Sequence, residues 1–163
     1  MKHTISILVE NHAGVLARVA GLFARRGFNI DSLAVGVTED EKISRITIIA
    51  DGTAYTLEQI EKQLNKLIDV IKVRHLPAEE LLSRELVLIK GACQPSQRAE
   101  LISLAEIAKA KISDITVNTM TLELSDSVPR IKTFEELLRP YGIKETVRTG
   151  SIAMQKGGAS MKL

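Results

Sequence analysis

A strand, a short polar turn and an amphipathic helix follow one another at the start of the chain. Residues 4–10 alternate between apolar and polar side chains, with Ile5, Ile7 and Val9 on one face, which predicts a strand. Residues 14–26 carry apolar side chains at helical spacing, and Gly27 is placed to end the helix. The strand, the turn and the helix N-terminus together would present backbone N–H groups and a positive dipole end to a small anion.

The pattern continues through two further strands, a helix and a fourth strand. Residues 28–37 and 43–50 are rich in strand formers and flank a polar hairpin loop at 38–42. The next helix follows the apolar spacing of residues 57–67, with Thr56 as the expected N-cap and Gln59 completing a capping box. Residues 69–76 form the last strand of this set. The order βαββαβ predicts a ferredoxin-like domain over residues 1–76.

A second βαββαβ pass follows a break at Pro77. Residues 77–84 are expected to be a linker or a short helix, and residues 85–155 a second ferredoxin-like domain. The expected elements are strands at 85–90, 111–117, 120–124 and 143–154, the last interrupted by Gly150, and helices at 97–109 and 129–139. Residues 156–163 are expected to be a flexible tail. The predicted fold class is therefore α+β, with two ferredoxin-like domains in tandem.

Composition excludes several classes of protein. Apolar residues make up 45% of the 163 residues but aromatic residues only 3%, so the core must be aliphatic and stacking platforms for nucleic acid are missing. The net charge is +2 and each half of the chain carries +1, so neither half is a basic arm. No apolar run approaches 18 residues, and the single cysteine excludes an intrachain disulfide. We therefore expect a cytoplasmic protein that binds neither nucleic acid nor membrane.

A catalytic or metal site is not expected from the sequence. The three histidines lack metal-ligand spacing, and Cys93 is expected to be a small buried residue. The carboxylates of residues 39–41 lie on a hairpin tip. The fold also serves acylphosphatases, but Arg18 comes one helical turn too late for their phosphate loop. We expect no catalytic residue, no metal and no cofactor in this chain.

The turn before the first helix is the candidate binding site. Asn11 ends the strand and Gly14 opens the helix; Asn11 could simply cap the helix, and Gly14 could simply relieve a tight turn. Asn29 lies in F-N-I-D, where asparagine is a poor strand former, and either a ligand contact from a second copy or a cap or edge position explains it. A site of this kind suits a free amino acid, with Leu16, Ile30 and Val35 as candidates for an aliphatic wall.

Homodimerisation is also expected from the fold. A four-stranded sheet with helices on one face leaves its other face and its edges unprotected, and such domains tend to pair. The dimer interface could complete the site near Asn11.

These residues carry a resemblance to a known family. The block E-N-H-A-G-V-L-A-R-V-A-G-L-F-A-R-R-G-F-N-I-D-S-L-A-V (10–35), with S-R-I-T-I (44–48) and residues 57–70, strongly resembles the small regulatory subunit of acetohydroxyacid synthase (acetolactate synthase), whose N-terminal half is an ACT domain. R-E-L-V-L-I-K and V-R-T-G-S-I-A-M-Q-K-G (147–157) resemble the C-terminal domain of that family.

The resemblance implies a partner and an effector. The catalytic large subunit, a separate chain, would carry thiamine diphosphate, Mg²⁺ and FAD, and this chain would activate it and confer feedback inhibition by valine or another branched-chain amino acid. The effector would bind between the ACT domains of a dimer. The effector-binding positions implied here are Asn11, His12, Ala13, Gly14, Val15 and Leu16, with Asn29 and Ile30 from the other chain.

An alternative interpretation keeps the ACT domain but assigns it a different regulated protein. A stand-alone amino-acid sensor could control another enzyme or a transcription factor. Control of DNA would need a basic helix, whereas residues 97–109 are mixed in charge. The sequence does not distinguish between valine, leucine and isoleucine as effector.

Overall fold

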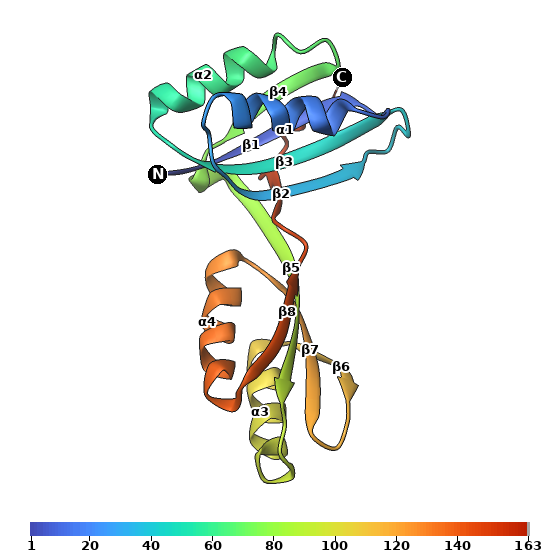
Figure 1. Cartoon of the computed structure of the whole chain (residues 1–163), viewed down its shortest axis with the longest axis vertical. Coiled ribbons are helices and arrows are strands. Elements are labelled where there is room, and N and C mark those ends of the chain that lie inside the picture. Colours follow the sequence, from blue (N-terminus) through green and yellow to red (C-terminus); the bar gives the residue numbers. More distant parts are fainter. Residues whose placement is uncertain (163) are drawn as a thin grey trace. The chain divides into compact units, whose positions relative to one another are not determined.

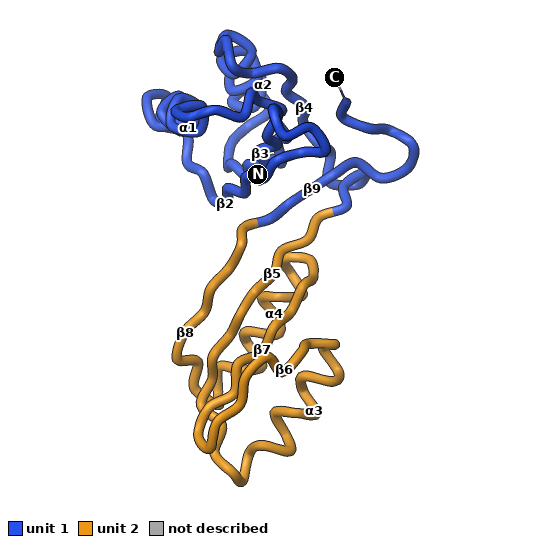
Figure 2. Tube along the Cα trace, turned by 90° about the vertical axis from the view of Figure 1, so that its right-hand side faces the viewer, with its two compact units in different colours: residues 1–82, 151–163 blue, residues 83–150 orange. Residues whose placement is uncertain are grey.

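The computed structural model describes residues 1–162 and divides into two compact units, residues 1–82 with 151–163 and residues 83–150 (Figures 1 and 2). The division differs from the expected domains in one respect. Residues 151–155 belong to the first unit, although the sequence suggested that they extend the last strand of the second domain. Gly150, with φ of +81°, separates the two parts of that expected strand.

The first unit has the expected element order. Its elements are β1 (Lys2–Glu10), α1 (Val15–Arg25), β2 (Ile30–Val37), β3 (Ile43–Asp51), α2 (Ala54–Leu64) and β4 (Val70–Leu76). The sheet order is β2-β3-β1-β4 with antiparallel neighbours, the order of a ferredoxin-like domain. The two helices pack on one face of the sheet, over a core that includes Ile5, Ile7, Val19 and Phe23 (Figure 1). The predicted fold class is confirmed for this unit.

The face of the first sheet that lies opposite the helices is not open, contrary to the expectation for a four-stranded sheet with helices on one face. Ser6 and Leu8 point away from the helices and are nonetheless buried. The Arg45 guanidinium donates from Nε to Ser6 Oγ at 2.8 Å and from Nη2 to the Ala153 carbonyl at 2.9 Å. Met161 lies beside Leu8 at the end of the same face. The chain's own residues 151–162 therefore cover this face, and β2 and β4 remain as the sheet's edges.

Further hydrogen bonds hold this covering segment, which contains the short strand β9 (Ile152–Gln155). Ser151 donates its backbone N–H to Ser32 Oγ at 2.9 Å. Lys72 Nζ donates to the Lys162 carbonyl at 2.6 Å, and Arg74 Nη1 donates to the Ser160 carbonyl at 3.2 Å. The segment expected to be a flexible tail thus supplies acceptors to side chains of β4.

The first residues after β4 do not form an extended linker. Ala78–Glu80 is a turn of 3₁₀ helix, and β5 (Leu81–Ala92) begins inside the segment 77–84. The expectation of a short helix there is met, and the strand starts earlier than expected.

The second unit repeats the topology. After β5 come α3 (Arg98–Ala108), β6 (Lys111–Ile115), β7 (Thr119–Asp126), α4 (Val128–Leu138) and β8 (Ile143–Arg148), with 3₁₀ turns at Pro95–Gln97 and Arg139–Tyr141. The sheet order is β6-β7-β5-β8, which corresponds strand for strand to the first sheet. Its core includes Val87, Ile89, Leu122, Ile131 and Phe134. No helix within residues 1–162 combines the length and the hydropathy needed to cross a membrane.

One predicted helix start is wrong. The N-cap of α2 is Thr53, whose Oγ1 accepts the backbone N–H of Thr56 at 3.2 Å. Thr56 therefore occupies the third helical position, and no capping box with Gln59 forms there. Residues 54 and 55 are exposed and Thr56 is only partly buried. The apolar spacing that starts at Leu57 therefore gave no sign of the first turn of α2.

Candidate effector-binding site

The turn between β1 and α1, which we call the β1–α1 turn (residues 11–16), leaves the helix N-terminus without a side-chain cap. Gly14 is the N-cap residue, with φ of +87°, and no side chain accepts from the first helical turn. A Cβ at Gly14 would meet only the Arg18 guanidinium at 3.9 Å, so the left-handed backbone, rather than lack of space, requires glycine. The N–H groups that open α1 have no acceptor within the helix and can bind an anion.

Asn11 does not cap α1. Its Nδ2 donates to the Glu41 carbonyl at 2.8 Å, and its backbone N–H donates to the Lys42 carbonyl at 2.7 Å. The side chain thus ties the β1–α1 turn to the hairpin between β2 and β3. The capping alternative is wrong, and Asn11 instead lines an open groove together with His12, Glu41 and Ile43.

Asn29 lies apart from Asn11 in the single chain. It follows Phe28 just before β2, is exposed, and donates from Nδ2 to Asp31 Oδ1 at 2.9 Å. No hydrogen bond joins the two asparagines within residues 1–162. A site that uses both amides therefore needs a second copy of the chain, which stays a prediction.

The remaining predicted residues divide into core and surface. Val15 is buried in the core of the first unit, so its side chain supports the turn and only its backbone is left for contact with a ligand. Ile30 is partly buried against the same core. Leu16 and Val35 are 42% and 47% exposed, respectively, as an aliphatic wall for a ligand side chain would be.

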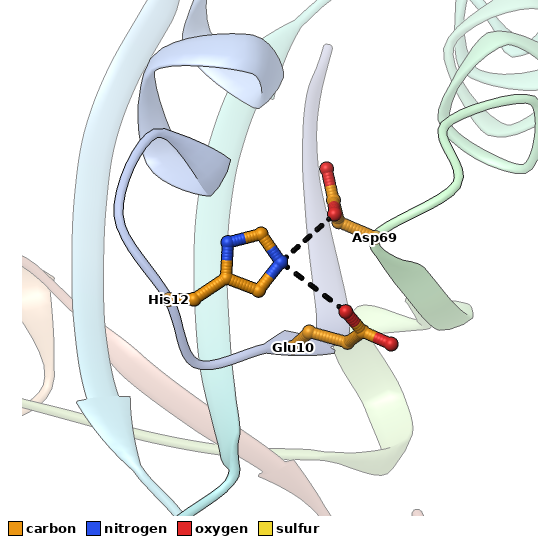
Figure 3. Close-up of side chains that lie close together, drawn as sticks. All are labelled: Glu10, His12 and Asp69. Atoms are coloured by element: carbon orange, nitrogen blue, oxygen red, sulfur yellow. Dashed lines mark hydrogen bonds and ion pairs between the residues drawn. The ribbon is translucent and has the colours of Figure 1, made fainter.

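A cluster that sequence reasoning missed adjoins this turn (Figure 3). His12 Nε2 lies 3.0 Å from Asp69 Oδ1 and 3.2 Å from Glu10 Oε2. The other oxygen of Asp69 lies 2.7 Å from Arg18 Nε. We call these four residues the His12 cluster. Asp69 is nearly buried, whereas Glu10, His12 and Arg18 are about half exposed. Asp69 lies just ahead of β4, far from the turn in sequence, and no local pattern connects it to His12.

The cluster affects the protonation of its histidine. The Ala13 carbonyl, 3.1 Å from Nδ1, and the two carboxylates raise the pKa of His12 above its ordinary value near 6.5, although desolvation opposes them. Glu10, His12 and Asp69 offer one nitrogen and two oxygens within 4.8 Å of one another, an arrangement that could hold a metal ion. The Arg18 guanidinium already neutralises Asp69, however, and a protonated His12 satisfies both carboxylates.

Cys93, His3 and His75 lie away from this turn, whereas the hairpin loop with residues 39–41 adjoins it. Cys93 is buried in the core of the second unit and carries a free thiol. His3 and His75 pack edge to face, with ring centroids 5.4 Å apart. Residues 39–41 lie in the hairpin loop as expected.

Comparison with known proteins accounts for both units. Residues 5–72 match the family described as the AHAS small subunit-like ACT domain, and residues 84–157 match the family described as the small subunit of acetolactate synthase. The probable acetolactate synthase small subunit of Archaeoglobus fulgidus is 49% identical over 157 residues, which cover 96% of this chain and 98% of that protein. The chain belongs to the acetolactate synthase small-subunit family.

Other members of the acetolactate synthase small-subunit family agree in length and fold. The probable small subunit of Methanothermobacter thermautotrophicus is 50% identical over 160 residues, covering 98% of this chain and 95% of that protein. The crystal structure of the acetolactate synthase small subunit from Thermotoga maritima is 38% identical, with a TM-score of 0.92 over 98% of this chain and 99% of the other. Because the family match extends through the second unit, an isolated ACT sensor of another enzyme is not favoured.

Proposed function

We propose that this chain is the regulatory subunit of an acetolactate synthase, and that its first domain binds a branched-chain amino acid. Membership of the small-subunit family supports a separate catalytic large subunit as partner. Thiamine diphosphate, Mg²⁺ and FAD would belong to that subunit, and this chain would carry no catalytic group. The buried thiol of Cys93 is compatible with a reducing cytoplasm.

The observation that carries the effector proposal is the uncapped N-terminus of α1 behind Gly14. The carboxylate of the amino acid would accept the N–H groups of residues 13–16, and the Asn11 amide oxygen would accept from its ammonium group. Leu16 and Val35 would contact the aliphatic side chain. Aliphatic pockets separate ligands by about 1–3 kcal/mol per methylene, so valine, leucine and isoleucine would compete.

A second copy would complete the site. β2 is an edge strand of the first sheet, and Val35 and Val37 on it are exposed. A homodimer through the first domain would bring Asn29 and Ile30 of one copy toward the β1–α1 turn of the other. Ligand binding would then tighten the dimer, and the catalytic subunit would respond through a coupling of about 1–3 kcal/mol.

Replacement of Gly14 tests the effector site. Gly14→Asp places a carboxylate where the ligand carboxylate would bind, whereas Gly14→Asn has the same shape and the same tolerance of positive φ without the charge. Calorimetry with valine, leucine and isoleucine should show binding to the wild-type chain, a large loss in Gly14→Asp and a smaller loss in Gly14→Asn. Undiminished binding to Gly14→Asp would refute the site.

Reconstitution tests the regulatory role. The chain alone should form no acetolactate from pyruvate, and addition of the large subunit should give an activity that rises with this chain and falls with the effector. Measurable acetolactate from the chain alone, or failure to retain a thiamine-dependent large subunit in a pull-down, would overturn the assignment.

A further inference from the structure

Both ring nitrogens of His12 face hydrogen-bond acceptors. Nδ1 lies 3.1 Å from the Ala13 carbonyl oxygen, and Nε2 lies within 3.2 Å of carboxylate oxygens of both Glu10 and Asp69. A neutral imidazole has one N–H and one lone pair, so one nitrogen would direct its lone pair at an acceptor. Only the doubly protonated ring donates to every one of these acceptors, so the arrangement favours the imidazolium.

The charges around the ring come from three parts of the first unit. Glu10 belongs to β1 and Asp69 to the segment before β4 (Figure 3). Arg18 belongs to α1. With His12 protonated, the two carboxylates and the two cations of the His12 cluster sum to zero. Loss of the proton leaves a net charge of −1 beside the β1–α1 turn. The hairpin side chains Asp40, Glu41 and Lys42 line the adjacent groove and add one further negative charge.

The ring also holds the backbone of the turn. In the imidazolium, Nδ1–H donates to the carbonyl of Ala13, which is part of the peptide whose N–H belongs to Gly14. The orientation of that peptide decides whether the Gly14 N–H points toward an incoming carboxylate. Deprotonation would add negative charge and remove one of the two ring N–H donors. Because both carboxylates face Nε2, the neutral ring would keep its Nε2–H and lose the hydrogen bond from Nδ1 to the Ala13 carbonyl, which would release the backbone of the turn.

We propose that the proton on His12 sets the affinity of the β1–α1 turn for a carboxylate ligand, so that the protonated protein binds its amino-acid effector more tightly. The proposal rests on the effector site of the proposed function and adds its regulation by pH. Because the pKa of His12 is raised from about 6.5, the transition moves toward neutral pH.

Two measurements on the full-length chain test this. NMR titration of the imidazole signals, with the His12 signal assigned through His12→Gln, should give a midpoint above 6.5 without ligand. Glu10→Gln removes one acceptor charge and should lower that midpoint. Calorimetry with valine from pH 6 to pH 8.5 should show the affinity falling roughly threefold to tenfold, since a change of one pKa unit on binding corresponds to a factor of ten.

Variants separate His12 from other titrating groups. The pH dependence of valine affinity should flatten in His12→Gln and persist in the matched control His3→Gln, whose ring lies at the other end of β1. A midpoint at or below 6.5, or an unchanged pH dependence in His12→Gln, would overturn the inference while leaving the proposed function intact. Absence of binding of valine, leucine or isoleucine at every pH would instead overturn both.

Discussion

The Arg18 guanidinium holds the nearly buried carboxylate of Asp69, with Nε 2.7 Å from Oδ2. The Asp69 backbone carbonyl accepts the N–H of Glu10 at 2.9 Å, so the same residue also closes the end of β1. One aspartate therefore connects the first turn of α1, the end of β1 and the start of β4. This connection fixes the position of the β1–α1 turn relative to the sheet.

Removal of the Arg18 charge should destabilise the first unit. Arg18→Gln leaves the buried Asp69 carboxylate beside Glu10 with His12 as the remaining positive charge of the cluster, and we expect a loss of about 1–2 kcal/mol in the free energy of unfolding. Urea unfolding monitored by circular dichroism measures it. Arg25→Gln, in the last turn of the same helix, is the matched control, and an equal loss in both variants would contradict the role of the pair.

Arg148 should contribute more to stability than a surface arginine. It donates from Nε and Nη2 to the two oxygens of Glu85, which is 6% exposed, at 2.8 and 3.0 Å, and its Nη1 lies 3.6 Å from Glu135. Arg148→Gln should cost about 2–3 kcal/mol, and Arg148→Lys an intermediate amount because lysine cannot form both bonds.

Arg130→Gln is the comparison for that measurement. Arg130 pairs with Asp126 at 2.9 Å on the surface, and its side chain is 63% exposed. Exposed pairs contribute up to about 1 kcal/mol. Denaturant unfolding of the three variants should therefore rank Arg148→Gln as the least stable, and the reverse order would contradict the importance of the Glu85 contact.

The N-terminus of α2 should depend on Thr53 rather than on Thr56. Thr53→Ala removes the oxygen that accepts the Thr56 N–H and should cost about 1 kcal/mol. Thr56→Ala keeps that backbone donor and should cost less. Amide hydrogen exchange of residues 54–57 reports on this end of the helix directly. Faster exchange in Thr56→Ala than in Thr53→Ala would restore the cap expected from the sequence.

His75 should weaken the fold on acidification. Burial and the neighbouring His3 lower the pKa of His75 below 6.5. Below pH 6.5, His75 is protonated in the unfolded chain but remains neutral in the folded chain. The free energy of unfolding therefore decreases as the pH falls from about 6.5 toward the pKa of His75 in the folded chain. Unfolding free energies at pH 7.5 and pH 5.5 should differ less in His75→Gln than in the wild-type chain.

His12 should have the opposite effect on the pH dependence of stability. Its raised pKa means that the folded chain binds the proton first, so its contribution is present below pH 6.5 and is lost as the pH rises through the folded pKa. His12→Gln should therefore lose more stability between pH 7.5 and pH 5.5 than the wild-type chain. An equal loss in both would indicate that His12 titrates alike in the folded and unfolded states.

Most of the fold follows from local patterns in the sequence. The alternation of Ile5, Ile7 and Val9 and the helical spacing from Val15 to Phe23 predicted the first elements within two residues. The repeat of βαββαβ predicted the sheet order of both units. Local patterns also located the turn with Gly14, since few residues other than glycine adopt its backbone conformation.

Long-range partners were not predictable in this way. Asn11 donates a hydrogen bond to the hairpin between β2 and β3, and Asp69 contacts His12 although the two are far apart in sequence. Neither contact has a signature in the neighbouring sequence. The burial of Ser6 and Leu8 on the face away from the helices depends on residues that follow the second unit in the chain. A period of two predicts which face a side chain takes, but not what will cover that face.

The first unit is thus assembled from segments that precede and follow the second unit in sequence. During synthesis, residues 1–82 leave the ribosome well before residues 151–162, and the face that carries Ser6, Leu8 and Arg45 stays uncovered until residues 151–162 have followed. The closing entropy of so long a loop grows only slowly with its length, so the late arrival of the segment costs little thermodynamically. The nascent chain nevertheless passes through a period in which one face of the four-stranded sheet is open to chaperones and to other nascent copies.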